Sequence, residues 1–339
     1  MNILTISGSP HVHDRDSVKK IMWTVIIAMI PMAAVSVLFF GWDALRVMLI
    51  SVLACVLIEW LIQKYLMKTP TTIGDGSAII TGLLLAFNVP SSLDWWILVI
   101  GAIVAIGVAK MSFGGLGKNP FNPALVGRVF LLVSFPQQMT MWPKAKVLLT
   151  ETIPHAITGA THAADATTGA TPMGIITYGL SSGQDVSDVI AQLPDYAQSL
   201  IGQYGGSLGE MSIIAILLGG IFMLFRKAIT WHIPVSFLGT AFVFAGIVHL
   251  INPTLYVPPM YHLMFGGMLL GAIFMATDMA TSPMSPWGQI MFGFGCGALT
   301  MIIRLWGAYP EGVSFAILIM NALVPLINKG FKPKRPGKR

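Results

Sequence analysis

The sequence predicts an all-α polytopic membrane protein with about ten transmembrane helices, arranged as two inverted five-helix repeats around one long extracytoplasmic loop. Of the 339 residues, 55% are hydrophobic and only 10% are charged, whereas soluble domains carry about 25% charged residues. Apolar runs recur along the chain, and runs of about 18 or more residues indicate transmembrane helices. The polar segment 137–209 separates these runs into two groups of five. Because each group has an odd number, any repeat must be inverted in the membrane.

The ten apolar runs define the expected spans and parts. They lie at 21–40, 44–66, 77–90, 95–112, 122–136, 211–226, 233–252, 261–277, 287–306 and 313–328. The chain is therefore expected to have three parts: a polar arm with the first repeat at 1–136, the loop at 137–209, and the second repeat with a basic tail at 210–339.

The basic residues predict the orientation of these spans. An even number of spans places both termini on one side. If that side is the cytoplasm, most Lys and Arg residues fall inside, including those of the C-terminal segment FKPKRPGKR. This agrees with the positive-inside rule. Both termini are therefore expected in the cytoplasm, and the loop 137–209 is expected to be extracytoplasmic.

Composition also bears on partners and on metal clusters. The net charge of +6 comes from residues that are scattered between spans and collected in the tail, so membrane orientation explains it better than nucleic-acid binding. Cys55 and Cys296 lie in different apolar runs. They form no CxxC pair and no iron–sulfur ligand set, and we expect both to be buried and inert.

Two carboxylates next to apolar runs are candidates for an ion path. Asp75 precedes the third run and Asp278 follows the eighth, and a carboxylate at membrane depth is a functional candidate by default. Asp75, followed by Gly76 and Ser77, could equally cap a helix N-terminus. Asp278 is the stronger candidate, because the dipole at a helix C-terminus opposes a negative charge.

The segment FGGLGKNPFNPALVGR, 113–128, is predicted to be irregular backbone at the inner face. Such backbone is tolerated at membrane depth only where protein or a cavity surrounds it. Asn119, Asn122 and Arg128 supply donors there, which could hold a planar heterocycle or a phosphate or could satisfy loose carbonyls.

Three weaker signals have structural interpretations. Arg304, near the outer end of the ninth run, is expected to extend to the headgroups. The segment GFGCG, 293–297, is expected to supply small residues for close helix packing. In GQYGGSLGEMS, Ser207 is expected near the start of the sixth span as a helix cap.

The polar stretch DATTGATPMG, 165–174, is predicted to be an exposed loop, because small residues with no positive charge can neither anchor a helix in lipid nor build a core. A weak internal similarity relates GLLLAFNVPSS in the first half of the chain to AIFMATDMATS in the second half. Short apolar runs interrupted at matching places in two halves indicate a central ligand site.

Several motifs in order resemble one family. SPHVH, DGSAIITGLLLAFNVP, FGGLGKNPFNPALVGRVFL, TGAT, GGSLGE and GAIFMATDMATSP extend over nearly the whole chain. The chain resembles the RnfD subunits of Rnf ion-translocating oxidoreductases and, more distantly, the NqrB subunits of sodium-pumping NADH:quinone reductases. The short N-terminal arm and GGSLGE favour the RnfD group.

This resemblance implies a covalent flavin in the loop. The family motif is D-x-x-[ST]-G-A-T, and its last threonine carries FMN through a phosphoester bond. Thr171 is then the attachment point, and Asp165, Thr168, Gly169 and Ala170 are the recognition residues. The attachment threonine should lie outside regular structure, and a following proline, Pro172, biases it away from helix.

The resemblance also implies a second flavin, riboflavin held without a covalent bond near the inner side. We expect Asn119, Phe121, Asn122 and Asp278 to surround it. Flavins in both places would carry electrons across the membrane, since the redox chemistry belongs to the cofactor and the protein positions it.

The implied function is that of the RnfD component of an Rnf complex in the cell inner membrane, which links ferredoxin and NAD to Na+ or H+ translocation. The implied partners are a second FMN-bearing flavoprotein, iron–sulfur subunits, a flavin transferase for maturation, and membrane lipids. We expect the chain alone to be catalytically incomplete. Two alternatives remain: an NqrB-like component of a quinone reductase, and a small-solute channel, because the family is thought to share the architecture of urea channels.

Overall fold

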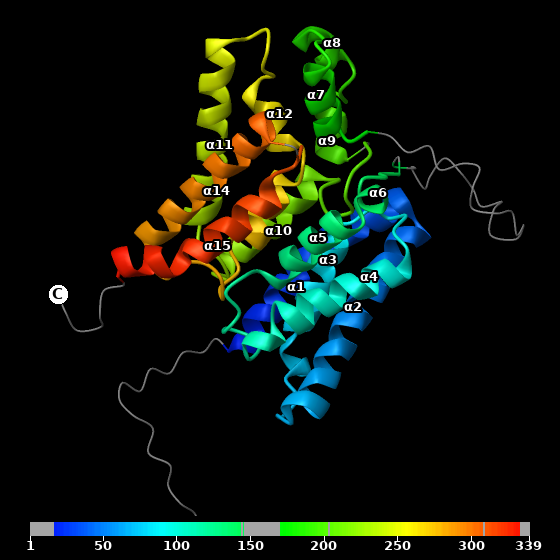
Figure 1. Cartoon of the computed structure of the whole chain (residues 1–339), viewed down its shortest axis with the longest axis vertical. Helices are drawn as coiled ribbons and strands as arrows, with labels where there is room; N and C mark the ends of the chain where they lie inside the picture. The colour runs from blue at the N-terminus through cyan, green and yellow to red at the C-terminus, as the bar shows by residue number, and fades with distance from the viewer. Residues whose placement is uncertain (1–16, 144, 146–169, 203, 308, 333–339) are drawn as a thin grey trace, which may run out of the picture.

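The computed structural model describes residues 17–143, 145, 170–202, 204–307 and 309–332, and the regular elements within these ranges are helical (Figure 1). The longer helices are α1 Val18–Phe40, α2 Trp42–Leu61, α3 Ser77–Phe87, α4 Trp95–Ala102, α5 Pro123–Ser134, α7 Pro172–Ser181, α10 Ile213–Phe225, α11 His232–Ile251, α14 Pro286–Trp306 and α15 Val313–Gly330. The shorter ones are η1 Ile62–Met67, η2 Ile73–Asp75, η3 Ile103–Val108, η4 Met111–Phe113, α6 Pro136–Met139, α8 Val186–Ala191, α9 Tyr196–Ile201, α12 Pro259–Met264, α13 Met268–Leu270 and η5 Gly271–Met275.

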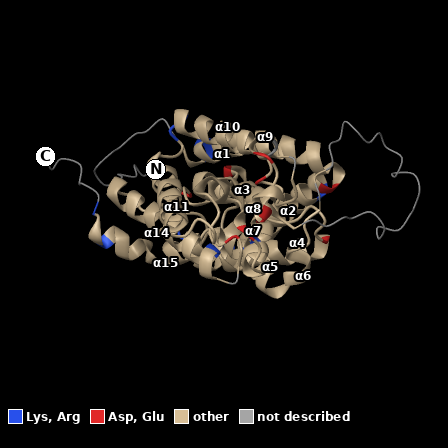
Figure 2. Cartoon of the chain, turned by 90° about the horizontal axis from the view of Figure 1, so that it is seen from above, with Lys and Arg blue, Asp and Glu red and all other residues tan. Residues whose placement is uncertain are grey.

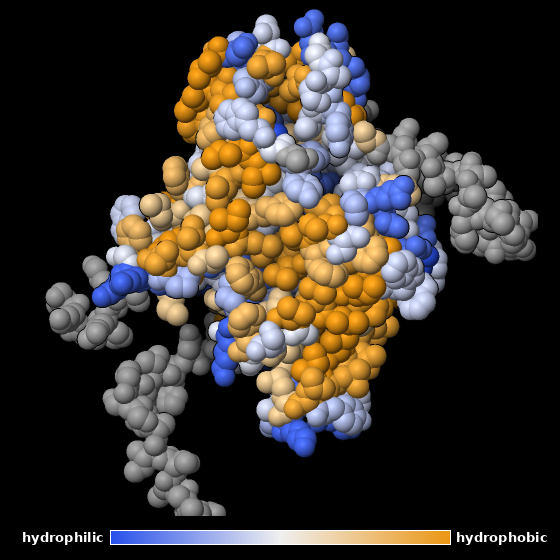
Figure 3. All heavy atoms as spheres, in the orientation of Figure 1, coloured by the Kyte–Doolittle hydropathy of each residue, from blue (hydrophilic) through white to orange (hydrophobic). Residues whose placement is uncertain are grey.

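The helices form two groups. Figures 1 and 2 both place α11, α14 and α15 on one side and α2, α4 and α5 on the other. Contacts between α5 and α15 connect the groups. Figure 2 shows few charged residues along the long helices, and Figure 3 shows a broad apolar surface over the lower part of the visible face.

Six helical segments are long and apolar enough to cross a membrane, which confirms an all-α, multi-pass membrane protein. They are Val18–Phe40, Trp42–Met67, Trp95–Phe113, His232–Ile251, Pro286–Trp306 and Val313–Gly330. Three more apolar helices, α3, α5 and α10, have 11 to 13 residues. At 1.5 Å per residue they extend about 16–20 Å, short of the roughly 30 Å of a bilayer core.

The expectation of one continuous helix over 261–277 is wrong. The chain forms α12, turns at Gly266 and Gly267, and then forms α13 and η5. Both glycines have a positive φ, +72° and +65°, a conformation that other residues adopt only at a cost. The apolar run continues across this turn, so hydropathy alone does not reveal it.

Three segments are π-helical: η1, η3 and η5. Hydrogen bonds from Ala109 N to Val104 O, at 3.0 Å, and from Ala276 N to Gly271 O, at 2.8 Å, skip one residue more than an α-helix does. Such turns frequently mark functional sites. Each of the three leads directly into one of the irregular segments that follow α2, α4 and α13.

The segment 204–212 fits closely between helices. The amide of Gly209 donates to the Phe87 carbonyl at the end of α3, at 2.9 Å. Glu210 is buried, and its carboxylate accepts the N–H of Ser207 at 2.9 Å. The expectation that Ser207 caps the next helix is wrong, because Ser212 caps α10 by accepting the Ala215 N–H. This segment is therefore part of the helix packing.

Small residues allow α11 and α14 to pack closely, as GFGCG predicted. A Cβ on Gly293 would lie 2.8 Å from the Ile233 carbonyl oxygen, and one on Gly297 would lie 2.5 Å from that of Phe237. Cys55 and Cys296 are both buried and free, as expected.

The predicted exposed loop at 165–174 is wrong for its last four residues. Residues 165–169 lie outside the described residues, and Ala170 is exposed. Thr171, Pro172, Met173 and Gly174 are buried and begin α7. The small side chains permit this burial, and Pro172 occupies the first helical position, where a missing N–H costs nothing. The described part of 137–209 also carries α8 and α9.

A Gly209→Ala substitution should destabilise the protein. The added Cβ would lie 2.4 Å from Cβ of Phe87 and 2.9 Å from Cδ2 of Leu270, and overpacking of this kind costs about 1–3 kcal/mol. Gly239→Ala is the control, because a Cβ there meets nothing within 4 Å. Thermal unfolding in detergent should show a lower Tm for Gly209→Ala alone. Equal Tm values would contradict the packing described for this segment.

A Glu210→Gln substitution should change the pH dependence of stability. Burial raises the pKa of the Glu210 carboxyl above its ordinary value of 4.5. The folded state therefore binds the proton more tightly than the unfolded state, and this stabilisation is lost as pH rises from about 4.5 through the folded-state pKa. Glutamine does not titrate, so the Tm of the variant relative to the wild type should rise with pH in that range. Parallel profiles would contradict this.

Candidate functional site

One cavity collects most of the polar residues that the sequence singled out at the inner side. We call it the Lys110 cavity. Its polar lining comes from α3, from the junction between η3 and η4, and from the segments that follow η4 and η5. These residues are Ser77, Thr81, Lys110, Asn119, Asn122, Thr277 and Asp278. Apolar side chains of α1, α3 and α10 complete the wall.

The two asparagines of NPFNP are held in place by their own amides. Asn122 caps α5: its Oδ1 accepts the N–H of Ala124 at 3.1 Å, and its Nδ2 donates to the Met275 carbonyl at 3.2 Å. Asn119 Nδ2 donates to the Phe121 carbonyl at 3.1 Å, and its Oδ1 accepts the Gly117 N–H at 3.2 Å. Because an amide nitrogen carries two hydrogens, each asparagine has a second N–H besides the one that donates here.

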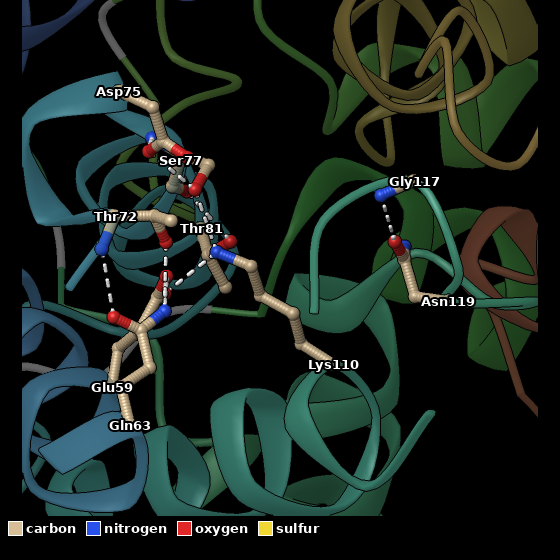
Figure 4. A network of polar contacts seen from close by, with 9 residues as sticks. All are labelled: Glu59, Gln63, Thr72, Asp75, Ser77, Thr81, Lys110, Gly117 and Asn119. Atoms are coloured by element: carbon tan, nitrogen blue, oxygen red, sulfur yellow. Dashed lines mark hydrogen bonds and ion pairs between the residues drawn. The ribbon is translucent and has the colours of Figure 1, made fainter. Parts of the chain in front are cut away.

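Lys110 is the centre of a buried polar network (Figure 4). It is 1% exposed, and its Nζ donates to Glu59 Oε2 at 2.6 Å and to Ser77 Oγ at 2.7 Å. Gln63 donates from Nε2 to the other oxygen of Glu59 at 3.2 Å and to Thr72 Oγ1 at 2.7 Å. The ammonium is therefore paired, and Lys110 also belongs to the lining of the cavity.

The two candidate carboxylates occupy different positions. Asp278 lines the cavity, and its oxygens accept from the Ala280 N–H at 3.4 Å and the Thr281 hydroxyl at 3.2 Å. Burial raises the pKa of the Asp278 carboxyl above its usual range. Asp75 does not line the cavity. Its Oδ1 accepts the N–H and the hydroxyl of Ser77, both at 2.7 Å, which is the helix-capping alternative and also links Asp75 to Lys110 through one hydroxyl.

A second cavity borders Thr171. We call it the Thr171 cavity. It is lined by Arg128, Leu132, Met139, Thr140, Trp142, Thr171, Tyr309, Pro310, Glu311, Gly312, Ser314 and Phe315. The rings of Tyr309 and Phe315 stack at a centroid distance of 4.8 Å. The lining thus includes three aromatic side chains, one guanidinium and one carboxylate.

Thr171 is held as the N-cap of α7. Its backbone is extended, with φ −64° and ψ 153°, as expected before a proline. Its Oγ1 accepts the N–H of Gly174 at 3.0 Å, and the residue is 6% exposed. The hydroxyl is therefore fixed at the junction of the helix end and the cavity wall.

Arg128 lies at the Thr171 cavity, so the prediction that groups it with Asn119 and Asn122 at the inner face is wrong. It lies inside α5, and its guanidinium forms an ion pair with Glu311 and a hydrogen bond with Ser314. The pair connects α5 to the start of α15. A buried charge needs such a partner, and this partner lies far away in the sequence.

Arg304 does not extend to the surface, so that prediction is also wrong. It is 3% exposed and donates to the carbonyls of His262 at 2.5 Å, Phe265 at 3.0 Å, Gly266 at 2.9 Å and Glu311 at 2.8 Å. These carbonyls belong mainly to the turn between α12 and α13. Arg304 therefore satisfies backbone acceptors that the broken helix leaves unpaired.

The structure brings some predicted residues together and separates others. Asn119, Asn122 and Asp278 line one cavity. Phe121 is partly buried and does not belong to that lining, although its carbonyl holds Asn119. Asp165, Thr168 and Gly169 lie outside the described residues.

The sequence interpretation missed Lys110 and Glu311. Lys110 at the end of an apolar run counts as an orientation signal, and Glu311 lies in a short connection. The position of Lys110 just before the motif FGGLGKNP was the sign for it that the sequence offered.

Comparison with known proteins gives a consistent result. Residues 5–337 match the NQR2, RnfD, RnfE family. The chain is 43% identical to the D subunit of the proton-translocating ferredoxin:NAD(+) oxidoreductase complex of Clostridium ljungdahlii, over 100% of this chain and 97% of the relative. It is also 43% identical to the D subunit of the Na(+)-translocating ferredoxin:NAD(+) oxidoreductase complex of Acetobacterium woodii, over 98% and 95%. With the D subunit of the ion-translocating oxidoreductase complex of Stutzerimonas stutzeri the identity is 42%, over 96% and 93%. The chain belongs to the NQR2, RnfD, RnfE family.

Proposed function

We propose that this chain is the RnfD component of an Rnf-type ion-translocating electron transport complex, which carries electrons through bound flavins between ferredoxin and NAD partners and is coupled to Na+ or H+ movement. The names of its full-length relatives support this assignment. They favour it over an NqrB-like component of a quinone reductase and over a small-solute channel, since each belongs to a ferredoxin:NAD+ oxidoreductase complex.

The first flavin would be FMN joined to Thr171. Thr171 is the last residue of TGAT and lines a cavity with Trp142, Tyr309 and Phe315. Aromatic side chains suit the isoalloxazine ring, since stacked rings attract each other. A flavin supplies one- or two-electron transfer when bound, and this chain's residues would hold and shield the ring.

The second flavin would be riboflavin in the Lys110 cavity. The spare N–H groups of Asn119 and Asn122 and the ammonium of Lys110 are donors for the carbonyl and nitrogen edge of a flavin, and Phe274 and Leu84 supply apolar surface. A cation beside the ring favours the reduced, negatively charged form. Asp278 lines the same cavity. It would take up a cation when the flavin becomes negatively charged, so that the added charge is balanced.

One observation carries the assignment of an electron path: both cavities share α5. Asn122 at its start lines the Lys110 cavity, and Arg128 and Leu132 line the Thr171 cavity. Asn122 and Arg128 are six positions apart, about 9 Å along the helix axis. Flavins in the two cavities would be separated by part of one short helix, much less than a membrane thickness.

We extend the proposal to topology and assembly. Ten spans in two inverted repeats, with both termini cytoplasmic and 137–209 extracytoplasmic, would place the chain in the inner membrane. The described helices α3, α5 and α10 would then end at membrane depth. The partners would be a second FMN-bearing flavoprotein, iron–sulfur subunits, lipids and a flavin transferase. Because Thr171 is 6% exposed, the transferase would act before α7 packs.

A Thr171→Asn substitution tests the flavin attachment. Asparagine caps a helix as well as threonine does, but it has no hydroxyl that could form the ester. After coexpression with the flavin transferase, the wild-type band should fluoresce on a denaturing gel and the variant band should not. Thr177→Ala, which changes a hydroxyl within the same helix, should keep the fluorescence. A fluorescent Thr171→Asn band, or a dark wild-type band, would refute the assignment.

An Asp278→Asn substitution tests the ion path. In the assembled complex reconstituted in vesicles, ion uptake driven by ferredoxin and NAD should fall severalfold, because the variant cannot bind and release a cation by changing charge. Flavin content should not change. Asp94→Asn is the control, since Asp94 is exposed and its side chain makes no capping bond. Normal ion uptake by Asp278→Asn would remove this residue from the path.

A further inference from the structure

The buried guanidinium of Arg128 has a role that the electron path does not explain. Arg128 is 7% exposed and lines the Thr171 cavity. Its Nη atoms bind Glu311 and Ser314, while its Nε is buried and has no hydrogen-bond partner within the described residues. A buried N–H without an acceptor destabilises the folded protein. The Nε–H of Arg128 is therefore suited to bind an acceptor from a group that is attached after folding.

The end of α7 supplies the second element at the same cavity. Thr171 caps this ten-residue helix, and Pro172 contributes no N–H. The Gly174 N–H donates to Thr171 Oγ1 and the Ile175 N–H donates to the Thr171 carbonyl. The attraction of this helix end for an anion therefore rests on the N–H of Met173 and on the partial positive charge that the helix dipole adds there. Helix N-termini of this kind bind phosphate groups. Thr171 is thus positioned so that a phosphate on its oxygen would meet both the helix end and the cavity wall.

The two charges that line the cavity balance each other, so an added anion would be held by the unpaired Nε–H of Arg128 and by the helix end. Arg128 is its cationic residue and Glu311 its acidic one among the lining residues. Glu311 and Ser314 bind two of the nitrogens and fix the guanidinium plane, which leaves the Nε edge for a further acceptor. A phosphodiester carries one negative charge and two free oxygens, and arginine recognises phosphate oxygens well.

We propose that Arg128, together with the N-terminal turn of α7, holds the phosphodiester that joins the flavin to Thr171. This assignment rests on the proposed function, because it requires the covalent flavin. Arg128 would act as a positioning residue: it fixes the phosphate, and the aromatic residues Trp142, Tyr309 and Phe315 then receive the ring at one place on the cavity wall. Glu311 and Ser314 hold the guanidinium ready before the flavin is attached.

The test compares each protein with and without covalent flavin. Wild type, Arg128→Lys and Arg128→Met are produced with and without the flavin transferase, and flavin loading is measured on denaturing gels. Loading should raise the Tm of the wild type by a few degrees. In both variants the rise should be at most half as large, because neither lysine nor methionine can supply the Nε–H. Arg226→Met, an exposed arginine outside the cavity, should show the full rise.

The outcomes separate this assignment from the proposed function. A wild type without covalent flavin refutes the proposed function itself. Flavin on all proteins with an equal rise in Tm refutes only the role of Arg128, which would then merely connect α5 to α15. If Arg128→Met does not fold, Arg128→Lys keeps a cation beside Glu311 and gives the comparison.

A free anion is distinguished with inorganic phosphate. Added to the flavin-free Thr171→Asn protein, phosphate should leave the Tm unchanged. If phosphate instead raises the Tm of Thr171→Asn, and does not raise the Tm of the double variant that also carries Arg128→Lys, the cavity binds a free anion. That result would overturn the assignment to the flavin ester.

Discussion

Three apolar helices of 11 to 13 residues end before they could cross a bilayer, and every backbone group at these ends must find a partner inside the protein. The partners come from glycine- and asparagine-rich segments. Gly209 binds the end of α3, Asn122 caps α5, and Ser212 caps α10. Polar segments are therefore drawn into the interior, and both cavities lie where they meet the short helices.

Two buried ion pairs follow the same pattern, since each one joins segments that are distant in the sequence. Lys110 pairs with Glu59 of α2, and Arg128 pairs with Glu311 before α15. A buried ion pair adds little net stability compared with apolar residues, but loss of one partner leaves a costly unpaired charge. The ion pairs therefore determine which helices lie together, and they add little to the free energy of unfolding. In both pairs the cationic residue also belongs to the lining of a cavity.

The long helices could be predicted from the sequence because apolar length is a local property. The break at Gly266 could not, since the residues on both sides are equally apolar. Nor could hydropathy place Arg128 and Arg304: an arginine in an apolar run either reaches water or finds acceptors, and those acceptors lie elsewhere in the chain. For the candidate site, Asn122 and Asp278 were found through family motifs and share one cavity, whereas spacing alone could not have joined them.

The π-helical turns have a geometric consequence for Lys110. A π-turn is an α-helix that has accommodated one additional residue, and one residue corresponds to about 100° of rotation around the axis. The turn η3 lies immediately before Lys110. Shortening that turn by one residue would restore a regular helix and rotate the lysine by about a quarter of a circle, away from Glu59. The direction of the Lys110 side chain is thus set by the one additional residue in η3. It depends on the number of residues in this turn and not on the chemistry of their side chains.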